Sequence, residues 1–429
     1  MHIELSKFPY PYKAALSICS DIDGTSLDRF IRIHTFLNTT KPTPMGDGLG
    51  LSITDSFWMY DDPEIRDSAF SYFDGAQPGA AAPVIRDFIR AGILDTMHAY
   101  GNFKNKNNFV RDRAEKALNE LDKHGLKVSV WTNHGGTDSI QNIGEQSSGE
   151  GDAPDTPSYH ADLLRDFGIR YYWDCERSLM TAIGQNRKAA FSDAYWRSPL
   201  YSGGARKLKA SVKGAASFAD RMSMKFFDMH MVSWPVFNPQ DNDLIVQDTL
   251  KDGGRIYRFR RFGLGNSDWS DHIPVLLNPR VLKELIKNGG AAVLYVHMGD
   301  RMNPYDADAF SPETVAAMNN VARLHHNGLL WVAGTKTLLN HQLISKYLNW
   351  TADNVSEAEL KIIIRQRLLS PFGEIIEVDD LAGVTFIIPA KFDAELFFEN
   401  EKIGYEALPH VNPEKRVLQI PLNNIDWPL

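Results

Sequence analysis

The stretch KAALSICSDIDGT, residues 13–25, decides how this sequence can fold. Within it, a short apolar run over residues 14–22 carries Asp21 and Asp23 at its carboxyl end, and Gly24 follows directly. A short apolar run of this kind, followed by polar residues and then by a helical pattern, is typical of a strand in an α/β fold. The stretch therefore predicts an α/β fold with two carboxylates at the end of its first strand.

The same pattern recurs along the chain. Apolar runs are followed by polar or glycine-rich residues and then by helical patterns, which are clearest over residues 111–124 and 312–326. This alternation predicts a parallel sheet, open or closed into a barrel. About eight strands match a β/α barrel, and we expect a distorted one over residues 1–350. The further expected strands cover residues 49–53, 93–97, 128–132, 169–173, 256–259, 291–296 and 329–332.

Two long segments interrupt the alternation. Residues 144–160 are rich in Gly, Ser and Pro and predict a loop. Residues 178–254 are aromatic and basic, and they are too long for a single connection. We expect this second segment to form a lid or an inserted subdomain.

The pattern changes after residue 350. A helix is expected over residues 357–368, together with short β-prone segments divided by turn residues. These segments cover residues 373–378, 383–389, 394–398 and 417–421. We therefore expect a small C-terminal β-rich domain over residues 351–429.

Composition limits the class of protein. The 429 residues are 43% hydrophobic and 23% charged, which is enough for a substantial core. A net charge of −8 argues against nucleic acid as a partner, although residues 206–213 are locally basic. Two cysteines exclude a disulfide scaffold and a four-cysteine zinc site. The N-terminus has no signal core and no apolar run reaches membrane-spanning length, so we expect a cytoplasmic protein without membrane contact; a removed secretion signal would leave no trace.

Ionisable side chains fall at the ends of four expected strands. In a β/α barrel the carboxyl ends of all strands meet at one face, where active sites lie. The residues at these ends are Asp21, Asp23, His98, His134 and His297. One carboxylate with two imidazoles is a ligand set for a catalytic divalent ion, with Zn²⁺ expected, and it leaves one position open. A second carboxylate nearby can accept a proton, and a histidine across the site can donate one.

The order of these motifs resembles that of the polysaccharide deacetylases of the NodB-homology type. The resemblance rests on SDID (residues 20–23), on His98, on LYVHMG (residues 294–299) and on the ending HHNGLLWVAGTKTLLNHQLI (residues 325–344). It covers roughly residues 10–350 and implies a barrel of the polysaccharide-deacetylase type that removes an N-acyl or O-acyl group from a carbohydrate.

The resemblance also implies a role for each matching residue. Asp21 would be the base, Asp23 and His98 metal ligands, and His297 the acid.

Two positions depart from the motifs of that family. Ile22 separates the two aspartates, which are adjacent in the family, and Asn102 stands where the second motif has its second histidine. We expect His134, from the neighbouring strand, to replace that histidine, and Asn102 to contact the substrate. The family's arginine has two candidates by position, Arg260 and Arg177.

A rival interpretation starts from the same first strand. Residues 21–25, DIDGT, match the DxDGT signature of haloacid-dehalogenase-like phosphatases. That resemblance implies Asp21 as the nucleophile, Asp23 as the acid and Mg²⁺ as the cofactor, with Thr132 and Asp300 in the later motifs. It leaves the three histidines without a role, and no clear lysine motif lies between Thr132 and Asp300. We therefore rank it second.

Residues near the strand ends are candidates for binding a sugar. Trp131 and Trp173 lie where an indole ring could stack on a sugar ring. Asn133, Asp152 and His160 follow the fourth strand, on the face where loops build the pocket. The residues predicted to bind the substrate are Asn102, Trp131, Asn133, Asp152, His160 and Arg260.

Two further interpretations involve a carbohydrate. A glycoside hydrolase needs two carboxylates roughly 5–9 Å apart, and Asp174 or Glu176 could pair with Asp21. A sugar-binding barrel without activity is the other. The sequence thus predicts a carbohydrate partner and specifies no oligomeric state.

Overall fold

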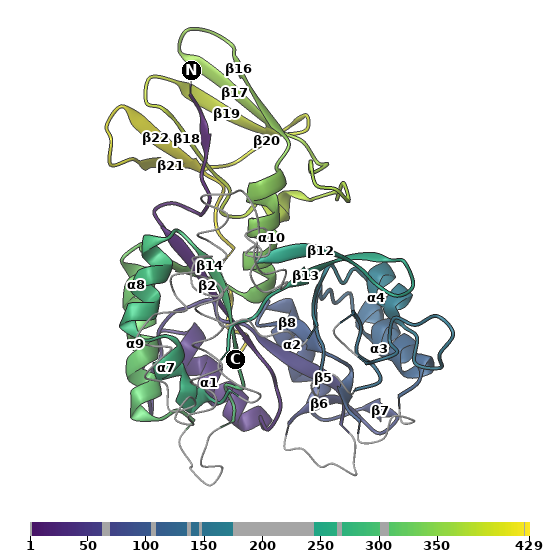
Figure 1. Cartoon of the computed structure of the whole chain (residues 1–429). Coiled ribbons are helices and arrows are strands. Elements are labelled where there is room, and N and C mark those ends of the chain that lie inside the picture. Colours follow the sequence, from purple (N-terminus) through teal and green to yellow (C-terminus); the bar gives the residue numbers. More distant parts are fainter. Residues whose placement is uncertain are drawn as a thin grey trace, which may run out of the picture.

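The computed structural model describes residues 2–61, 69–103, 109–134, 139–145, 148–174, 244–263, 268–300, 309–423 and 425–429. Figure 1 shows a lower body of sheets flanked by helices and an upper body made of strands. Of the expected lid over residues 178–254, residues 178–243 lie outside the described residues, as do Arg177, Glu176 and the basic segment 206–213.

The larger sheet of the lower body is mostly parallel. Its strands follow in the order β12-β13-β11-β10-β8-β5-β6-β7, with β9 also paired to β5. Neighbours from β13 to β6 are parallel, and β12 and β7 are antiparallel edges. The strands are β5 (Asp55–Asp61), β6 (Ser71–Asp74), β7 (Gln77–Pro78), β8 (Leu94–His98), β9 (Gly101–Asn102), β10 (Val130–Thr132), β11 (Tyr171–Trp173), β12 (Ile245–Thr249) and β13 (Arg255–Phe259).

A second parallel sheet is built on the stretch near the start of the chain. β2 (Ala14–Ser20) lies between β14 (Ala291–Val296) and β15 (Leu330–Val332). Every residue of β2 is buried. A bridge between Phe262 and Leu294 links β14 to the chain that follows β13. No strand pairing among the described residues joins β15 to β5, so closure into a barrel stays a prediction.

Helices follow the strands of both sheets. The expected helix over residues 111–124 is α3 (Arg111–Lys123), which buries Ala117 and Leu121 at helical spacing. The expected helix over residues 312–326 is α9 (Pro312–His326), which Ser311 caps. The remaining described helices are α1 (Leu27–Asn38), α2 (Ala82–Arg90), α4 (Ala161–Phe167), α7 (Ile273–Leu276), α8 (Pro279–Lys287) and α10 (Thr335–Tyr347), with short 3₁₀ turns η6 (Ser270–His272) and η7 (Val378–Leu381). None of the described helices is long and apolar enough to cross a membrane.

Two four-stranded sheets form the C-terminal region, in the orders β16-β17-β19-β20 and β1-β18-β22-β21. Because β1 pairs with β18, the first residues of the chain complete a sheet of this region. The strands are β1 (Glu4–Leu5), β16 (Trp350–Asn354), β17 (Glu359–Ile364), β18 (Thr385–Pro389), β19 (Asp393–Phe398), β20 (Glu401–Ile403), β21 (Glu406–Pro409) and β22 (Lys415–Gln419); β3 (Pro42–Thr43) and β4 (Gly46–Asp47) form a separate small hairpin in the lower body.

Three expectations about single elements are wrong. Residues 373–378, expected as a β segment, form only an isolated bridge between Ile375 and Arg367. Residues 357–368 contain the strand β17 instead of a helix, because Leu360, Ile362 and Ile364 are buried at every second position. Residues 49–53 form no strand, since the backbone N–H groups of residues 49–51 bond instead to the carbonyls of residues 36–39 at the end of α1, and the strand begins at Asp55.

The last residues of the chain return to the lower body. The ring of Trp427 lies 5.2 Å from that of Phe88 in α2, and Lys41 Nζ donates to the carbonyl oxygen of Leu429 at 3.0 Å. The N-terminal strand β1 therefore belongs to the upper body, whereas the C-terminal residues pack against the lower body.

Candidate active site

Four strands bring five ionisable side chains together. β2 and β14 are parallel neighbours, and so are β8 and β10. The carboxyl ends of parallel strands meet at one edge, so the residues that follow them share that edge. The side chains that meet there are those of Asp21, Asp23, His98, His134 and His297.

Asp23 lies at the centre of this group. Its Oδ1 is 3.3 Å from His98 Nε2, and its Oδ2 is 3.5 Å from His134 Nε2 and 3.4 Å from His297 Nε2. The three histidines are buried, whereas 26% of the Asp23 side chain is exposed, so the group opens to solvent on one side. Burial would raise the pKa of the Asp23 carboxyl, but His134 and His98 lower it well below its usual value. Burial would likewise lower the pKa of His134, but the Asp23 carboxylate raises it.

Asp23, His98 and His134 fit a divalent metal ion. One ligand atom from each lies within 4.8 Å of the other two. Asp23 Oδ1 and His98 Nε2 are both buried, and neither has a hydrogen-bond partner among the described residues. Buried polar atoms without a partner cost free energy, and a bound ion would satisfy both. A carboxylate with two imidazoles is also a known ligand set of catalytic zinc.

Neighbouring residues hold the two ligand histidines in place. His98 Nδ1 lies 2.8 Å from Thr132 Oγ1, and the His98 ring stacks on the buried ring of Trp58. The His134 ring meets the same indole edge-on. The backbone N–H and C=O of His134 both bond to the side-chain amide of Asn142, at 2.9 Å each. The imidazoles are thus oriented before any ligand binds.

Asp21 forms a buried ion pair with Arg261. Arg261 Nη1 and Nη2 lie 2.6 and 3.0 Å from Asp21 Oδ1 and Oδ2, and the guanidinium also lies over the rings of Trp173 and Tyr295. Burial would raise the pKa of the Asp21 carboxyl, but Arg261 and His98 lower it below its ordinary value. Asp21 is therefore held ionised, and a carboxylate with two bonds retains lone pairs that can accept a proton.

His297 is prepared to carry a proton. Its Nδ1 lies 3.2 Å from the carbonyl oxygen of Asp268, and its backbone N–H donates to the same oxygen at 2.6 Å. Because a carbonyl oxygen only accepts, Nδ1 is protonated and Nε2 faces Asp23. Burial would lower the pKa of His297, but the hydrogen bond and charge of Asp23 raise it to about 9.

Trp131 and Asn133, both predicted to bind substrate, are fully buried. Trp131 Nε1 donates to Asn133 Oδ1 at 2.9 Å, and the Asn133 amide also bonds to the backbone N–H and C=O of Ile143. An indole enclosed in this way has no face left for a sugar ring. The structure therefore corrects both predictions: the two side chains support the wall behind His134.

Asp152 and His160 are fully buried as well. Asp152 Oδ2 accepts from the backbone N–H groups of Gly144 and Lys251, and Oδ1 lies 3.1 Å from Lys251 Nζ. His160 Nδ1 bonds to the carbonyl oxygen of Ser158. The structure therefore also corrects the predictions that Asp152 and His160 contact the substrate. Their side chains instead fix the loop after β10 through these bonds.

The structure also places the residues on which the family motifs were uncertain. His134 faces Asp23, whereas Asn102 lies in β9 opposite Asp61. Arg261 is the arginine that binds Asp21, and its neighbour Arg260 is 7% exposed. Arg177 lies outside the described residues.

The sequence patterns missed Arg261 and Trp58. Tyr257 and Phe259 point into the core inside the sheets, and Arg261 follows with the same alternation, so strand periodicity could have selected it over Arg260. Trp58 had no comparable signal, because it belongs to β5, a strand expected several residues earlier.

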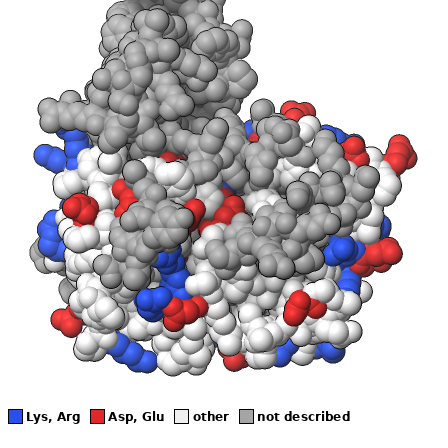
Figure 2. All heavy atoms as spheres, turned by 90° about the horizontal axis from the view of Figure 1, so that it is seen from below, with Lys and Arg blue, Asp and Glu red and all other residues white. Residues whose placement is uncertain are grey.

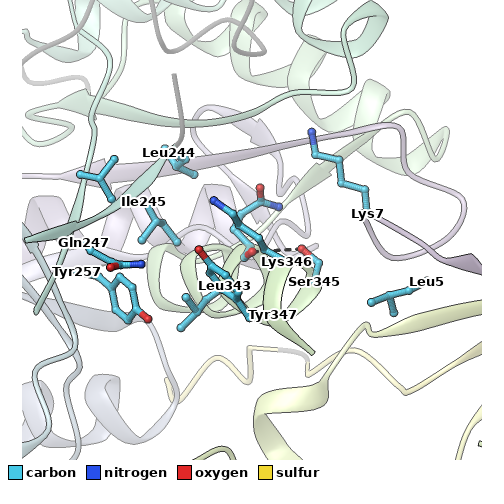
Figure 3. A pocket seen from close by; sticks show the side chains of 12 residues that line it. Leu5, Lys7, Leu244, Ile245, Gln247, Tyr257, Leu343, Ser345, Lys346 and Tyr347 are labelled. Atoms are coloured by element: carbon cyan, nitrogen blue, oxygen red, sulfur yellow. Dashed lines mark hydrogen bonds between the residues drawn. The ribbon is translucent and has the colours of Figure 1, made fainter. Parts of the chain in front are cut away.

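Cavities of about 450 Å³ lie elsewhere in the molecule. One is bordered by β12, α10 and the N-terminal strand, with Leu343 and Tyr347 of α10 in its wall (Figure 3). A second lies where α10 begins beside Asp95 and the C-terminal tail. Neither is lined by Asp21, Asp23 or the three histidines of the site. On the face shown in Figure 2, the described Lys and Arg side chains are scattered among acidic and neutral ones.

No protein-family model and no curated protein matches this sequence. One solved structure that is similar is an endo-beta-1,6-glucanase, with a TM-score of 0.28 and 8% sequence identity over 97% of this chain and 93% of that chain. A similarity of this size carries no argument about fold or function.

Proposed function

We propose that this protein is a metal-dependent hydrolase that removes an N-acyl or O-acyl group from a carbohydrate. The observation that carries the proposal is the pair of buried atoms Asp23 Oδ1 and His98 Nε2, which lie 3.3 Å apart without hydrogen-bond partners among the described residues. His134 Nε2 completes the set of ligand atoms.

Asp23, His98 and His134 would hold the ion, for which Zn²⁺ fits the ligand types. When bound, such an ion lowers the pKa of water and polarises an acyl carbonyl. The exposed part of the Asp23 side chain leaves the group accessible from solvent.

The chain itself supplies the proton transfers. Asp21, held ionised by Arg261, accepts a proton from the attacking water as the water oxygen bonds to the acyl carbon. His297 carries a proton and donates it to the nitrogen or oxygen of the sugar as the bond from that atom to the acyl carbon breaks. The two roles need opposite protonation states in one site, and the different surroundings of the two residues favour those states.

The substrate class rests on the resemblance to polysaccharide deacetylases, carried by SDID, His98 and LYVHMG. We propose on the same basis that the two parallel sheets belong to one distorted β/α barrel, and that β2, β8, β10 and β14 present their carboxyl ends to its active face.

The alternative enzymes are supported less well. A phosphatase with Asp21 as nucleophile and Asp23 as acid would give no role to the three histidines that surround Asp23. A glycosidase that uses Asp174 would employ a carboxylate already paired with Arg258 at 2.8 Å.

Acetate release from N- and O-acetylated oligosaccharides tests the proposal. The Zn²⁺-loaded protein should release acetate, and chelation should abolish the release until Zn²⁺ is restored. His98→Asn should lose most of this release at the same Zn²⁺ concentration, because one of the three proposed ligands is gone. His124→Asn is the matched control, since His124 lies at the end of α3 and pairs with Glu120. Equal rates for the chelated and loaded proteins, or for His98→Asn and the wild type, would refute the proposal.

A further inference from the structure

We infer that Thr132 is a positioning residue that holds His98 in the tautomer protonated at Nδ1, so that the lone pair of Nε2 is available to the metal ion. The inference rests on the proposed function, because it assigns a role to Thr132 at the proposed metal site. Thr132 itself touches neither the ion nor the substrate in this scheme.

The contacts of the His98 ring distinguish its two nitrogens. Nδ1 lies 2.8 Å from Thr132 Oγ1 and 3.6 Å from Asp21 Oδ1, and both of these oxygens can accept a hydrogen bond. Nε2 is buried without a hydrogen-bond partner among the described residues and faces Asp23 Oδ1. The ring therefore offers Nδ1 an acceptor and leaves Nε2 to a ligand.

The position of Thr132 is set by the sheet. Thr132 ends β10, lies opposite His98 of β8 in the parallel register, and is fully buried. Its carbonyl oxygen accepts the backbone N–H of Ala99 at 2.8 Å. Ala99 has a φ of 47°, in the left-handed region that alanine rarely adopts, so the chain is turned sharply just after His98. Thr132 thus holds both the ring of His98 and the backbone beside it.

Trp58 restricts the same ring from another side. The His98 and Trp58 rings are stacked at an interplanar angle of 16°. Stacking fixes the plane of the imidazole but not which nitrogen carries the proton. A metal ion on Nε2 leaves the ring proton on Nδ1, and the Thr132 hydroxyl, 2.8 Å away, accepts it there.

Metal-binding histidines generally donate their second N–H to an acceptor, and loss of that acceptor costs about 10–100-fold in metal affinity. Thr132→Val keeps the shape of the side chain and removes the acceptor. Thr132→Ser keeps the hydroxyl. We therefore expect Thr132→Val to bind Zn²⁺ about 10–100-fold more weakly than the wild type, and Thr132→Ser to bind it nearly as well.

Competition with a chromophoric chelator measures these affinities on the full chain. Thr385→Val is the matched control, because Thr385 is equally buried and its hydroxyl donates to Gly383 and Gln419 in the C-terminal region. An unchanged Zn²⁺ affinity in Thr132→Val, in a wild type that binds Zn²⁺ and loses it in His98→Asn, would overturn this inference alone. A wild type that binds no Zn²⁺ would refute the proposed function as well.

Nitrogen-15 NMR of histidine-labelled wild-type protein gives a readout that needs no Thr132 variant. The His98 signals, assigned by their loss in His98→Asn, should show a proton on Nδ1 and Zn²⁺ on Nε2. Zn²⁺ on Nδ1, or a proton on Nε2 in the loaded protein, would overturn the inference.

Discussion

Arg261 presents Nη1 and Nη2 to the two carboxylate oxygens of Asp21 at 2.6 and 3.0 Å, and the two side chains are 0% and 3% exposed. Paired bonds of this kind fix the direction of the carboxylate as well as its charge. A buried ion pair is costly to form, and it is costlier still to break by removing one partner. The pair thus holds the Asp21 carboxylate in one orientation for the proposed reaction. Removal of either partner should lower the free energy of unfolding.

Arg261→Met should destabilise the protein strongly, because it leaves the Asp21 carboxylate buried without a counter-charge. We expect the free energy of unfolding to fall by about 3–5 kcal/mol. The double variant Asp21→Asn/Arg261→Met should regain part of this loss, since neither charge remains, while staying inactive. Urea denaturation measures both. If the double variant is as unstable as the sum of its single variants, the two residues are not coupled.

His297→Asn should slow the hydrolysis of amides and poor esters by about 10²–10⁴-fold, the usual range for one general acid. An acyl sugar with a good leaving group needs less protonation and should lose less. Steady-state kinetics on such a pair of substrates measures the contrast. Equal losses on both substrates would mean that His297 binds or orients the substrate and donates no proton.

Asp21 should form no phosphoaspartate. In a phosphatase of the DxDGT type Asp23 would be the acid, but here three histidines that such a mechanism does not use surround its carboxylate. Incubation with beryllium fluoride or a phosphate ester, followed by peptide mapping, checks this. A modified Asp21 would favour the phosphatase over the deacetylase-like hydrolase.

The main elements of the site follow from strand ends, which the sequence marks clearly. The run over residues 14–22 and those before His98, His134 and His297 are strands, and parallel pairing brings their ends together. The predicted substrate contacts did not follow, because position after a strand does not reveal whether a side chain turns toward solvent. Asp152 and His160 turn inward and bind backbone groups of their own loop.

Helix and strand patterns are also ambiguous in short segments. The segment around β17 was expected to be a helix, although its buried residues Leu360, Ile362 and Ile364 recur with the period of a strand. The pairing of β1 with β18 could not be predicted, because it joins the two ends of the chain and leaves no local signal.

Stability should fall as the pH is lowered from about 6.5 to 4. Burial lowers the pKa of His160 and of His341 to about 4, so both stay neutral in the folded protein where the unfolded chain binds protons. The contribution of these neutral histidines to the free energy of unfolding is therefore fully present above the unfolded pKa of about 6.5. By pH 4 each histidine should lower the free energy of unfolding by about 2–3 kcal/mol.

Replacement of His160 separates this effect from the rest of the acid response. His160→Asn, which can still donate to Ser158, should flatten the pH dependence of the unfolding free energy between pH 6.5 and 4. His2→Asn, at an exposed position, should not. Identical slopes for the wild type and His160→Asn would show that His160 is not held neutral.

The metal content of the purified protein tests the central claim most directly. After equilibration with buffered Zn²⁺, elemental analysis by mass spectrometry should find one ion per chain. The variant Asp23→Ala/His98→Ala/His134→Ala should hold none, because it lacks all three proposed ligands. A triple variant that retains stoichiometric metal, or a wild type that binds none, would contradict the assignment of these residues as a metal site.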